Sequence, residues 1–236
     1  MPIHRIKRPQ SLTETVLNDI REAIIQGTIE LGSQLSELRL SESLGVSKTP
    51  VREALQELRR SGLVQIAPKS GTVVFLPDEK ELTDIFDLRL LLELGSAERL
   101  FERRFEETLA KMTSVVGQMQ AAVAAKDYRA YRQLDSDFHK AIVAGSDNAM
   151  IVEAYAPLSL KIDALRNRGL EVVSVIERSL AFHEKLLDLL RRQESAAFRD
   201  ALALHIANSR RDYTAWLEKF SPAQQERRGE RLDRGA

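Results

Sequence analysis

The chain has 236 residues, of which 43% are apolar and 30% charged, and its 35 basic and 35 acidic residues give a formal net charge of zero. This composition is typical of a helix-rich globular protein of one or two domains. The absence of cysteine excludes disulfides, thiolate zinc sites and cysteine nucleophiles. No apolar run approaches the roughly 18 residues that cross a bilayer, and no apolar core follows the basic start of the chain. We therefore expect a cytoplasmic protein with no membrane partner.

Short segments separated by Gly, Ser and Pro fill the first 76 residues. The expected elements are a helix from Ser11 to about Gln26, a helix from about Ser36 to Leu44, a helix from Ser47 or Thr49 to a C-cap at Gly62, and strands over 63–66 and 72–76. Pro50 lies in the first turn of the third helix, where a missing N–H costs little. Three short helices followed by a hairpin predict a winged helix-turn-helix domain over residues 1–76.

The start of the third helix carries the candidate DNA contacts, because the second helix of such a pair places its N-terminal residues at base edges in the major groove. The candidate DNA-binding residues are Ser47, Lys48, Thr49 and Arg52 on this helix, and Lys69 and Gly71 in the hairpin turn. Hydroxyl groups and cations can contact phosphates, and Arg52 can also contact a guanine edge. Residues 1–76 hold 10 Lys and Arg against 8 Asp and Glu, so this prediction depends on where the charges lie. Two helices joined by a Gly turn also occur in proteins that bind no DNA.

From residue 77 the pattern changes to long helical periods with few breakers. After a linker at 77–80, helices are expected over about 81–101, 104–125, 127–145, 148–168, 175–192 and 195–219. The expected fold is therefore mainly α, with an N-terminal winged helix-turn-helix and a C-terminal all-α six-helix bundle over 81–220. The segment 221–236 is charged and has no apolar periodicity, so we expect it to be disordered.

Three of the four histidines lie in this second region, and their spacing favours a metal site. Asp135 precedes His139 by four residues, so both lie on one helix face. His183 and His205 lie 10 or 11 residues from the break between two consecutive helices. An antiparallel pair would place them at the same height, roughly 15 Å from the turn. Three imidazoles and one carboxylate suit a divalent metal, Zn above Ni, Fe or Mn, with affinity falling in acid. The alternative is that these are core histidines with ordinary hydrogen bonds.

Residues 35–74 resemble the GntR family of bacterial regulators. The stretch from Gly45 to Leu55, GVSKTPVREAL, is nearly the family signature, and Gly62-Leu63-Val64 and Gly71-Thr72-Val73-Val74 follow it. The resemblance implies that Lys48, Thr49, Arg52, Lys69 and Gly71 face DNA. The sequence departs from the family at Lys48, where Arg is more frequent and a bidentate contact becomes a point charge. It departs again at Leu38, where a basic residue is frequent.

Residues 81–218 resemble the helical, FCD-type ligand-binding domain of the FadR branch of that family. The matching features are Arg89 and Glu93, Leu134-Asp135 with Phe138-His139, Asn148, His183 and His205. The resemblance implies that Asp135, His139, His183 and His205 ligate a metal whose open positions receive a small carboxylate effector. Arg89 could hold the other end of this effector by a charge-assisted pair, or it could pair structurally with Glu93 at i+4. Asn208, one turn after His205, is a weaker candidate for the same pocket.

We therefore expect a ligand-responsive DNA-binding transcription regulator rather than an enzyme. It would act as a homodimer on a palindromic operator of double-stranded DNA, as the repressor of a catabolic or transport operon. One alternative is a helical-bundle metalloenzyme with Glu184 or Asp137 as a general base, although the chain carries no zincin pattern. A second alternative is a DNA-architectural protein with a purely structural bundle.

Overall fold

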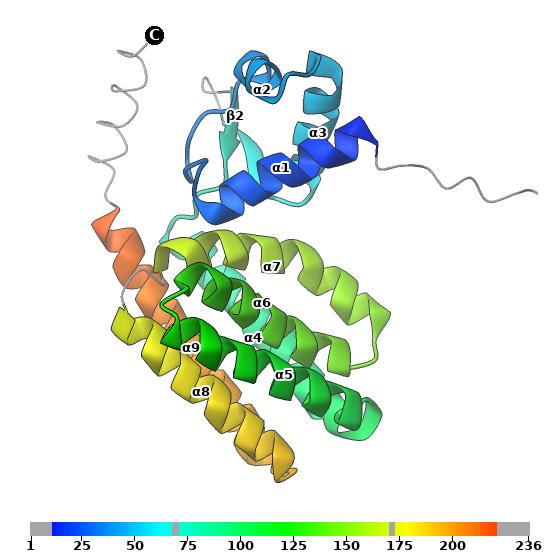
Figure 1. The fold of residues 1–236 in the computed structure, drawn as a ribbon, viewed down its shortest axis with the longest axis vertical. Helices are drawn as coiled ribbons and strands as arrows, with labels where there is room; N and C mark the ends of the chain where they lie inside the picture. The colour runs from blue at the N-terminus through cyan, green and yellow to red at the C-terminus, as the bar shows by residue number, and fades with distance from the viewer. Residues whose placement is uncertain (1–10, 68–70, 170–172, 221–236) are drawn as a thin grey trace, which may run out of the picture. The chain divides into compact units, whose positions relative to one another are not determined.

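The computed structural model describes residues 11–67, 71–169 and 173–220, and it divides the chain into two compact units, Met1–Leu76 and Pro77–Ala236 (Figure 1). In the first unit, the described elements are α1 (Leu12–Gln26), α2 (Glu37–Leu44), α3 (Lys48–Arg60), β1 (Val64–Ala67) and β2 (Gly71–Val74). The two strands pair antiparallel, with Val64 opposite Val74 and Ala67 opposite Gly71. An isolated bridge from Gln34 to Val73 adds the segment before α2 to this ribbon.

Local signals in the sequence account for the helix ends of the first unit. The Ser11 side chain accepts a hydrogen bond from the Glu14 backbone N–H, and Gly27 ends α1 in the left-handed conformation with φ of 84°. Gly45, with φ of 65°, makes the turn between α2 and α3. A large part of the core of the unit lies between α1 and α3, and it includes the buried side chains Val16, Ile20, Ile24, Val51, Ala54, Leu55 and Leu58.

Some boundaries differ from the expectation by one or two residues. The helix α3 ends at Arg60 with Ser61 as its C-cap, so the expected cap, Gly62, lies one residue beyond it with φ of 73°. Ser47 occupies the N-cap position of α3, but its side chain makes no capping hydrogen bond. The strand β1 is displaced by one residue toward the turn, and β2 begins one residue before and ends two residues before its expected bounds. Lys69 and the tail 221–236 lie outside the described residues.

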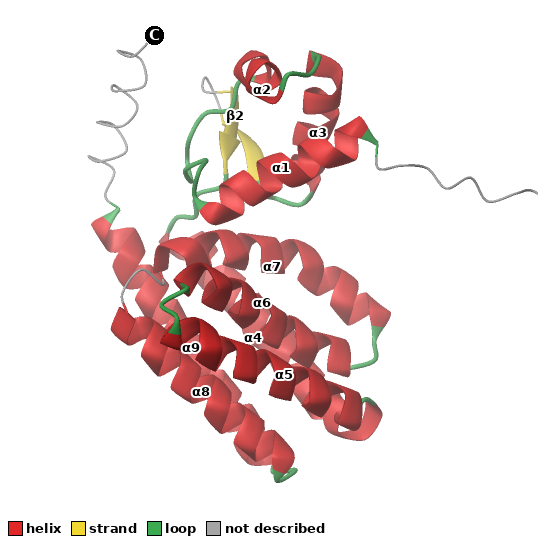
Figure 2. Cartoon of the chain, viewed as in Figure 1, coloured by secondary structure: helices red, strands yellow, loops and turns green. Residues whose placement is uncertain are grey.

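The described part of the second unit contains six helices and no strand, which confirms the expected fold class (Figure 2). The helices are α4 (Glu79–Arg103), α5 (Phe105–Ala124), α6 (Tyr128–Gly145), α7 (Ala149–Gly169), α8 (Val173–Arg191) and α9 (Ser195–Lys219). The helix α4 begins two residues before its expected start, because the Asp78 carboxylate caps it by accepting from the Glu81 N–H at 2.7 Å. The connection between the units is correspondingly short.

One buried centre of this bundle is surrounded by four helices, α4, α6, α8 and α9. The helix α4 packs against α6, α7 and α9, and α8 packs against α5 and α9. The end of α6 approaches α4 and α5 so closely that a Cβ at Gly145 would lie 2.6 Å from Thr108 Oγ1 and 2.9 Å from Leu100 Cβ. None of the described helices has the length and apolarity needed to cross a membrane.

Candidate metal centre and nucleic-acid interface

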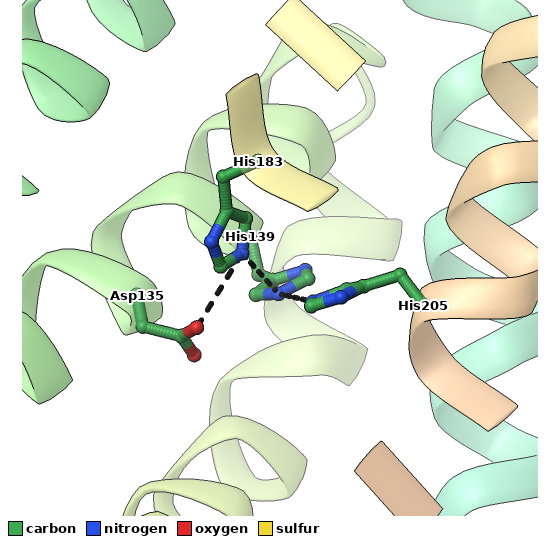
Figure 3. Close-up of side chains that lie close together, drawn as sticks. All are labelled: Asp135, His139, His183 and His205. Carbon is green, nitrogen blue, oxygen red and sulfur yellow. Dashed lines mark hydrogen bonds and ion pairs between the residues drawn. The ribbon is translucent and has the colours of Figure 1, made fainter. Parts of the chain in front are cut away.

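Three helices of the second unit each direct side chains into one buried cluster, formed by Asp135 and His139 of α6, His183 of α8 and His205 of α9 (Figure 3). Each residue offers one ligand atom, and these four atoms lie within 4.8 Å of one another. All four residues are buried. The structure therefore brings together the complete set that the spacing of the sequence singled out.

The distances within the cluster fit a metal-binding site. The His139 Nε2 atom lies 3.2 Å from His205 Nε2 and 3.5 Å from His183 Nε2. The His183 Nε2 atom lies 3.4 Å from Asp135 Oδ1. An ion with bonds of about 2.0–2.1 Å separates neighbouring ligand atoms by about 2.9 Å in octahedral geometry, which leaves positions open beside four protein ligands, and by about 3.3 Å in tetrahedral geometry. The donor set, three imidazoles and one carboxylate, is also one that first-row divalent metals accept.

Burial sets the protonation of the three imidazoles. Burial lowers the pKa of His183 to about 3, and it places the pKa of His139 and of His205 well below the ordinary value. At neutral pH these side chains are therefore uncharged, which is the form that ligates a metal. An ion can therefore bind without the prior deprotonation of a charged imidazole.

The carboxylate of Asp135 is held ionised by neighbours from α7 and α8. Burial alone would raise the pKa of Asp135, but the Arg166 guanidinium, followed by the imidazoles, brings the pKa below its usual value. Arg166 of α7 makes ion pairs with both Asp135 and Asp163. Ser179 of α8 donates a hydrogen bond of 3.3 Å to Asp135 Oδ1. These contacts fix the carboxylate that faces His183.

Glu93 of α4 joins the cluster to two further helices. Its Oε2 atom lies 2.7 Å from His139 Nδ1, and its Oε1 atom accepts 2.7 Å hydrogen bonds from Arg89 Nε and Tyr155 Oη. A carboxylate beside Nδ1 requires that this nitrogen carries the proton. The Nε2 lone pair of His139 is therefore directed toward the other ligands, as in the carboxylate–histidine pairs that orient metal ligands in general.

Glu93→Gln is expected to weaken the affinity for Zn²⁺ by about 10–100-fold, which is the usual effect of removing such a supporting group. The amide keeps the size of the side chain but loses the charge that favours the Nδ1–H form of His139. The measurement is competition for Zn²⁺ with a chelating dye. Tyr155→Phe is the matched control, since it removes a different hydrogen bond to Glu93 and leaves His139 untouched. Equal Zn²⁺ affinity in Glu93→Gln and the unaltered protein would contradict this role.

The two residues singled out for an effector have different surroundings. Arg89 is buried and pairs with Glu93, while its Nη2 atom has no hydrogen-bond partner among the residues that the structure describes. Asn208 lines a small pocket between α8 and α9, together with His205, Ser179 and Phe182. Asn208 also accepts a hydrogen bond from Arg211.

Glu93 was identified from the sequence, but its contact with His139 was not, and neither were Tyr155 and Arg166 of α7. Arg89 and Glu93 are four residues apart, so their pairing could be seen along one helix. The contacts of α7 join residues far apart in the chain, and no local pattern indicates them. Leu204 is 51% exposed although the next residue, His205, is buried. Adjacent residues of a helix do not share a face.

In the first unit, the described candidates for DNA contact lie on the surface. Ser47, Lys48, Thr49 and Arg52 are all exposed at the start of α3, and so is Gly71, with φ of 72°, after the hairpin turn. Because Ser47 makes no capping hydrogen bond, its hydroxyl group is available to a ligand. The structure thus presents hydroxyl groups and cations together at one helix N-terminus, where phosphate binding is favoured.

Comparison with protein families matches both units. Residues 12–74 match the model described as bacterial regulatory proteins, gntR family, and residues 84–208 match the FCD domain. The gluconate operon transcriptional repressor of Bacillus licheniformis is 29% identical over 181 residues, which cover 75% of this chain and 74% of the repressor. A protein of Paenarthrobacter nicotinovorans named "Probable D-xylose utilization operon transcriptional repressor" is 26% identical over 197 residues, which cover 82% of this chain and 86% of that protein.

A solved transcriptional regulator from Rhodococcus sp. RHA1 has the same fold. Its TM-score to this chain is 0.77 at 21% identity, and the match covers 86% of this chain and 97% of the other.

Proposed function

Because this chain belongs to the GntR family of bacterial regulatory proteins and carries an FCD domain, we propose that it is a ligand-responsive repressor controlling a catabolic or transport operon. The family consists of DNA-binding transcription regulators rather than enzymes, so the metalloenzyme alternative is not retained. Two repressors of sugar-related operons are among its relatives, which supports a catabolic target. The protein would act in the cytoplasm, where its DNA lies.

DNA recognition is assigned to the start of α3. Lys48 and Thr49 would contact phosphates, and Arg52 would contact a base edge in the major groove. The hairpin turn with Lys69 and Gly71 would reach the adjacent groove. A homodimer would present two such helices, so the operator would be palindromic. The exposure of Ser47, Lys48, Thr49 and Arg52 on one helix end supports this assignment.

The single observation that carries the sensing proposal is the buried cluster of Asp135, His139, His183 and His205, which would hold one divalent metal, Zn²⁺ before Ni, Fe or Mn. When bound, the metal supplies a Lewis-acidic position for an oxygen of an anionic effector. Asp135 is kept ionised by Arg166, and His139 is oriented by Glu93. The protein thus supplies ligands that are already in the binding form.

A small carboxylate is the effector class that the charges of the core favour. Around the cluster the buried cations are Arg89 and Arg166, and the buried anions are Glu93, Asp135 and Asp163. A divalent ion would leave an excess of one positive charge, which one carboxylate would neutralise. Arg89 has an unpartnered buried Nη2 atom within the described structure that would receive this anion. Asn208 would line the approach between α8 and α9.

Glu93 gives effector binding a physical connection to the rest of the chain. It belongs to α4, the helix that directly follows the DNA-binding unit in the chain, and it contacts a metal ligand of α6 and Tyr155 of α7. A ligand that prefers one arrangement of these helices would shift the population toward it. Operator affinity and effector affinity would then be reciprocally coupled.

To test this function, the unaltered protein in metal-loaded form is used to select DNA from a random duplex library. We expect enrichment of one palindromic sequence. The next step measures affinity for this operator with D-gluconate and a panel of other sugar acids and hydroxy acids. At least one acid is expected to release the DNA, and to raise the melting temperature of the metal-loaded protein only. Failure to enrich any sequence would contradict the proposed function.

A further inference from the structure

The guanidinium of Arg52 is held by a carboxylate from the neighbouring helix. Glu37, the first residue of α2, accepts hydrogen bonds from Arg52 Nε at 3.2 Å to each oxygen and from Arg52 Nη2 at 2.9 Å. The two residues are 15 positions apart in sequence, so this contact joins the two helices of the helix-turn-helix. The Glu37 carboxylate thus accepts from both nitrogen atoms, Nε and Nη2, along one edge of the guanidinium.

This ion pair contributes little to folding stability, because both side chains face solvent. Arg52 is 61% exposed and Glu37 37% exposed, and such surface pairs are worth little after side-chain ordering and screening. Its main physical consequence is conformational, since it restricts a long side chain that otherwise samples many rotamers. The pKa of Glu37 is lowered, chiefly by the hydrogen bond from Arg52, so the carboxylate is charged at neutral pH.

The free edge of the same guanidinium matches the acceptors of a guanine. With Nε and one N–H of Nη2 directed at Glu37, the N–H groups of Nη1 and the second N–H of Nη2 form the remaining edge. Within the described residues Nη1 of Arg52 donates no hydrogen bond. Two parallel N–H donors are the geometry that binds O6 and N7 of guanine in the major groove. Glu37 thus leaves the base-reading edge open while it fixes the plane of the group.

We propose that Glu37 is a positioning residue that orients Arg52 to read a G·C base pair of the operator. This inference rests on the proposed function, because it presupposes that α3 enters the major groove. It adds a residue of α2 to the determinants of sequence specificity, although the Glu37 carboxylate is itself repelled by DNA phosphates.

The direction in which one substitution changes the affinity for DNA separates a positioning role from a purely electrostatic one. Glu37→Gln removes a negative charge from the DNA-facing end of the domain, where Lys48 also lies close enough to lower the pKa of Glu37. If charge alone mattered, DNA binding would become tighter for every sequence. If Glu37 positions Arg52, binding to the selected operator becomes weaker while binding to a scrambled duplex is unchanged or tighter.

The test measures fluorescence anisotropy with full-length protein, using the selected operator, a scrambled duplex, and operators with each G·C pair changed in turn. For Glu37→Gln we expect an affinity for the operator about 10-fold lower, and loss of discrimination at one symmetric G·C pair. Glu42→Gln is the matched control, since it removes one exposed acidic charge from the same helix, and its discrimination should equal that of the unaltered protein. An unchanged or tighter affinity of Glu37→Gln for the operator would overturn the proposal.

A double-substitution cycle tests whether Glu37 acts through Arg52. In an Arg52→Ala background, Glu37→Gln should cause no further loss of discrimination, because the group that it positions is gone. If Glu37→Gln caused an equal loss of discrimination in the Arg52→Ala protein and in the protein with Arg52, the positioning role would be overturned and the proposed function would stand. If the unaltered protein enriches no sequence, the proposed function fails and this inference fails with it.

Discussion

Arg52→Ala is expected to weaken binding to the selected operator by at least about 100-fold, because each bidentate contact with guanine is worth about 5–150-fold in discrimination and a dimer makes the contact twice. The exposed side chain of Arg52 touches solvent and Glu37, so its removal leaves the core and the metal centre unchanged. Fluorescence anisotropy with the operator and a scrambled duplex gives the loss of specific binding, and elemental analysis gives the metal content.

Arg59→Ala is the control for this substitution, since it removes the same charge from an exposed position near the other end of α3. Its effect should be small and similar for all sequences. Operator affinity retained in Arg52→Ala would place the recognition surface elsewhere and contradict the assignment of α3.

His183→Ala is expected to reduce the metal content from about one ion per chain to below about 0.1. His183 Nε2 lies 3.4 Å from Asp135 Oδ1 and 3.5 Å from His139 Nε2, so it lies between the carboxylate and the imidazole of α6. Its loss removes one of the four protein donors and leaves an apolar gap in its place, so the remaining three ligands hold an ion much more weakly. Mass spectrometry of the metal in untagged protein measures this content directly.

His4→Ala is the control for this change, because it removes the one histidine outside the cluster. Circular dichroism distinguishes metal loss from unfolding, since the helical content of a folded variant stays unchanged. A full metal complement in folded His183→Ala protein would refute the ligand set.

Local physical signals in the sequence were sufficient to predict the elements that surround both sites. The Ser11 cap and the Gly45 turn each depend on neighbouring residues, and each is present in the structure. The four proposed metal ligands were also detectable, because Asp135 and His139 share one helix face and His183 and His205 are equidistant from one turn. Helical periodicity converts such spacing directly into proximity.

The contacts that hold these residues in place could not be predicted, because they depend on tertiary packing. The ion pair of Arg166 with Asp135 joins α7 to α6, and the hydrogen bond that His139 donates to Glu93 joins α6 to α4 across 46 residues. The pairing of Arg52 with Glu37 likewise depends on the angle between α2 and α3. In each case the partners carry ordinary charged side chains whose sequence context fits an exposed surface equally well.

The most direct test of the account is the metal content of the unaltered protein, purified without a tag or nickel resin and analysed by mass spectrometry. We expect about one divalent ion per chain, either as isolated or after incubation with Zn²⁺ and removal of the excess. A protein that retains no metal after incubation with Zn²⁺ or Ni²⁺ would contradict it, and the three buried histidines would then be core residues with ordinary hydrogen bonds.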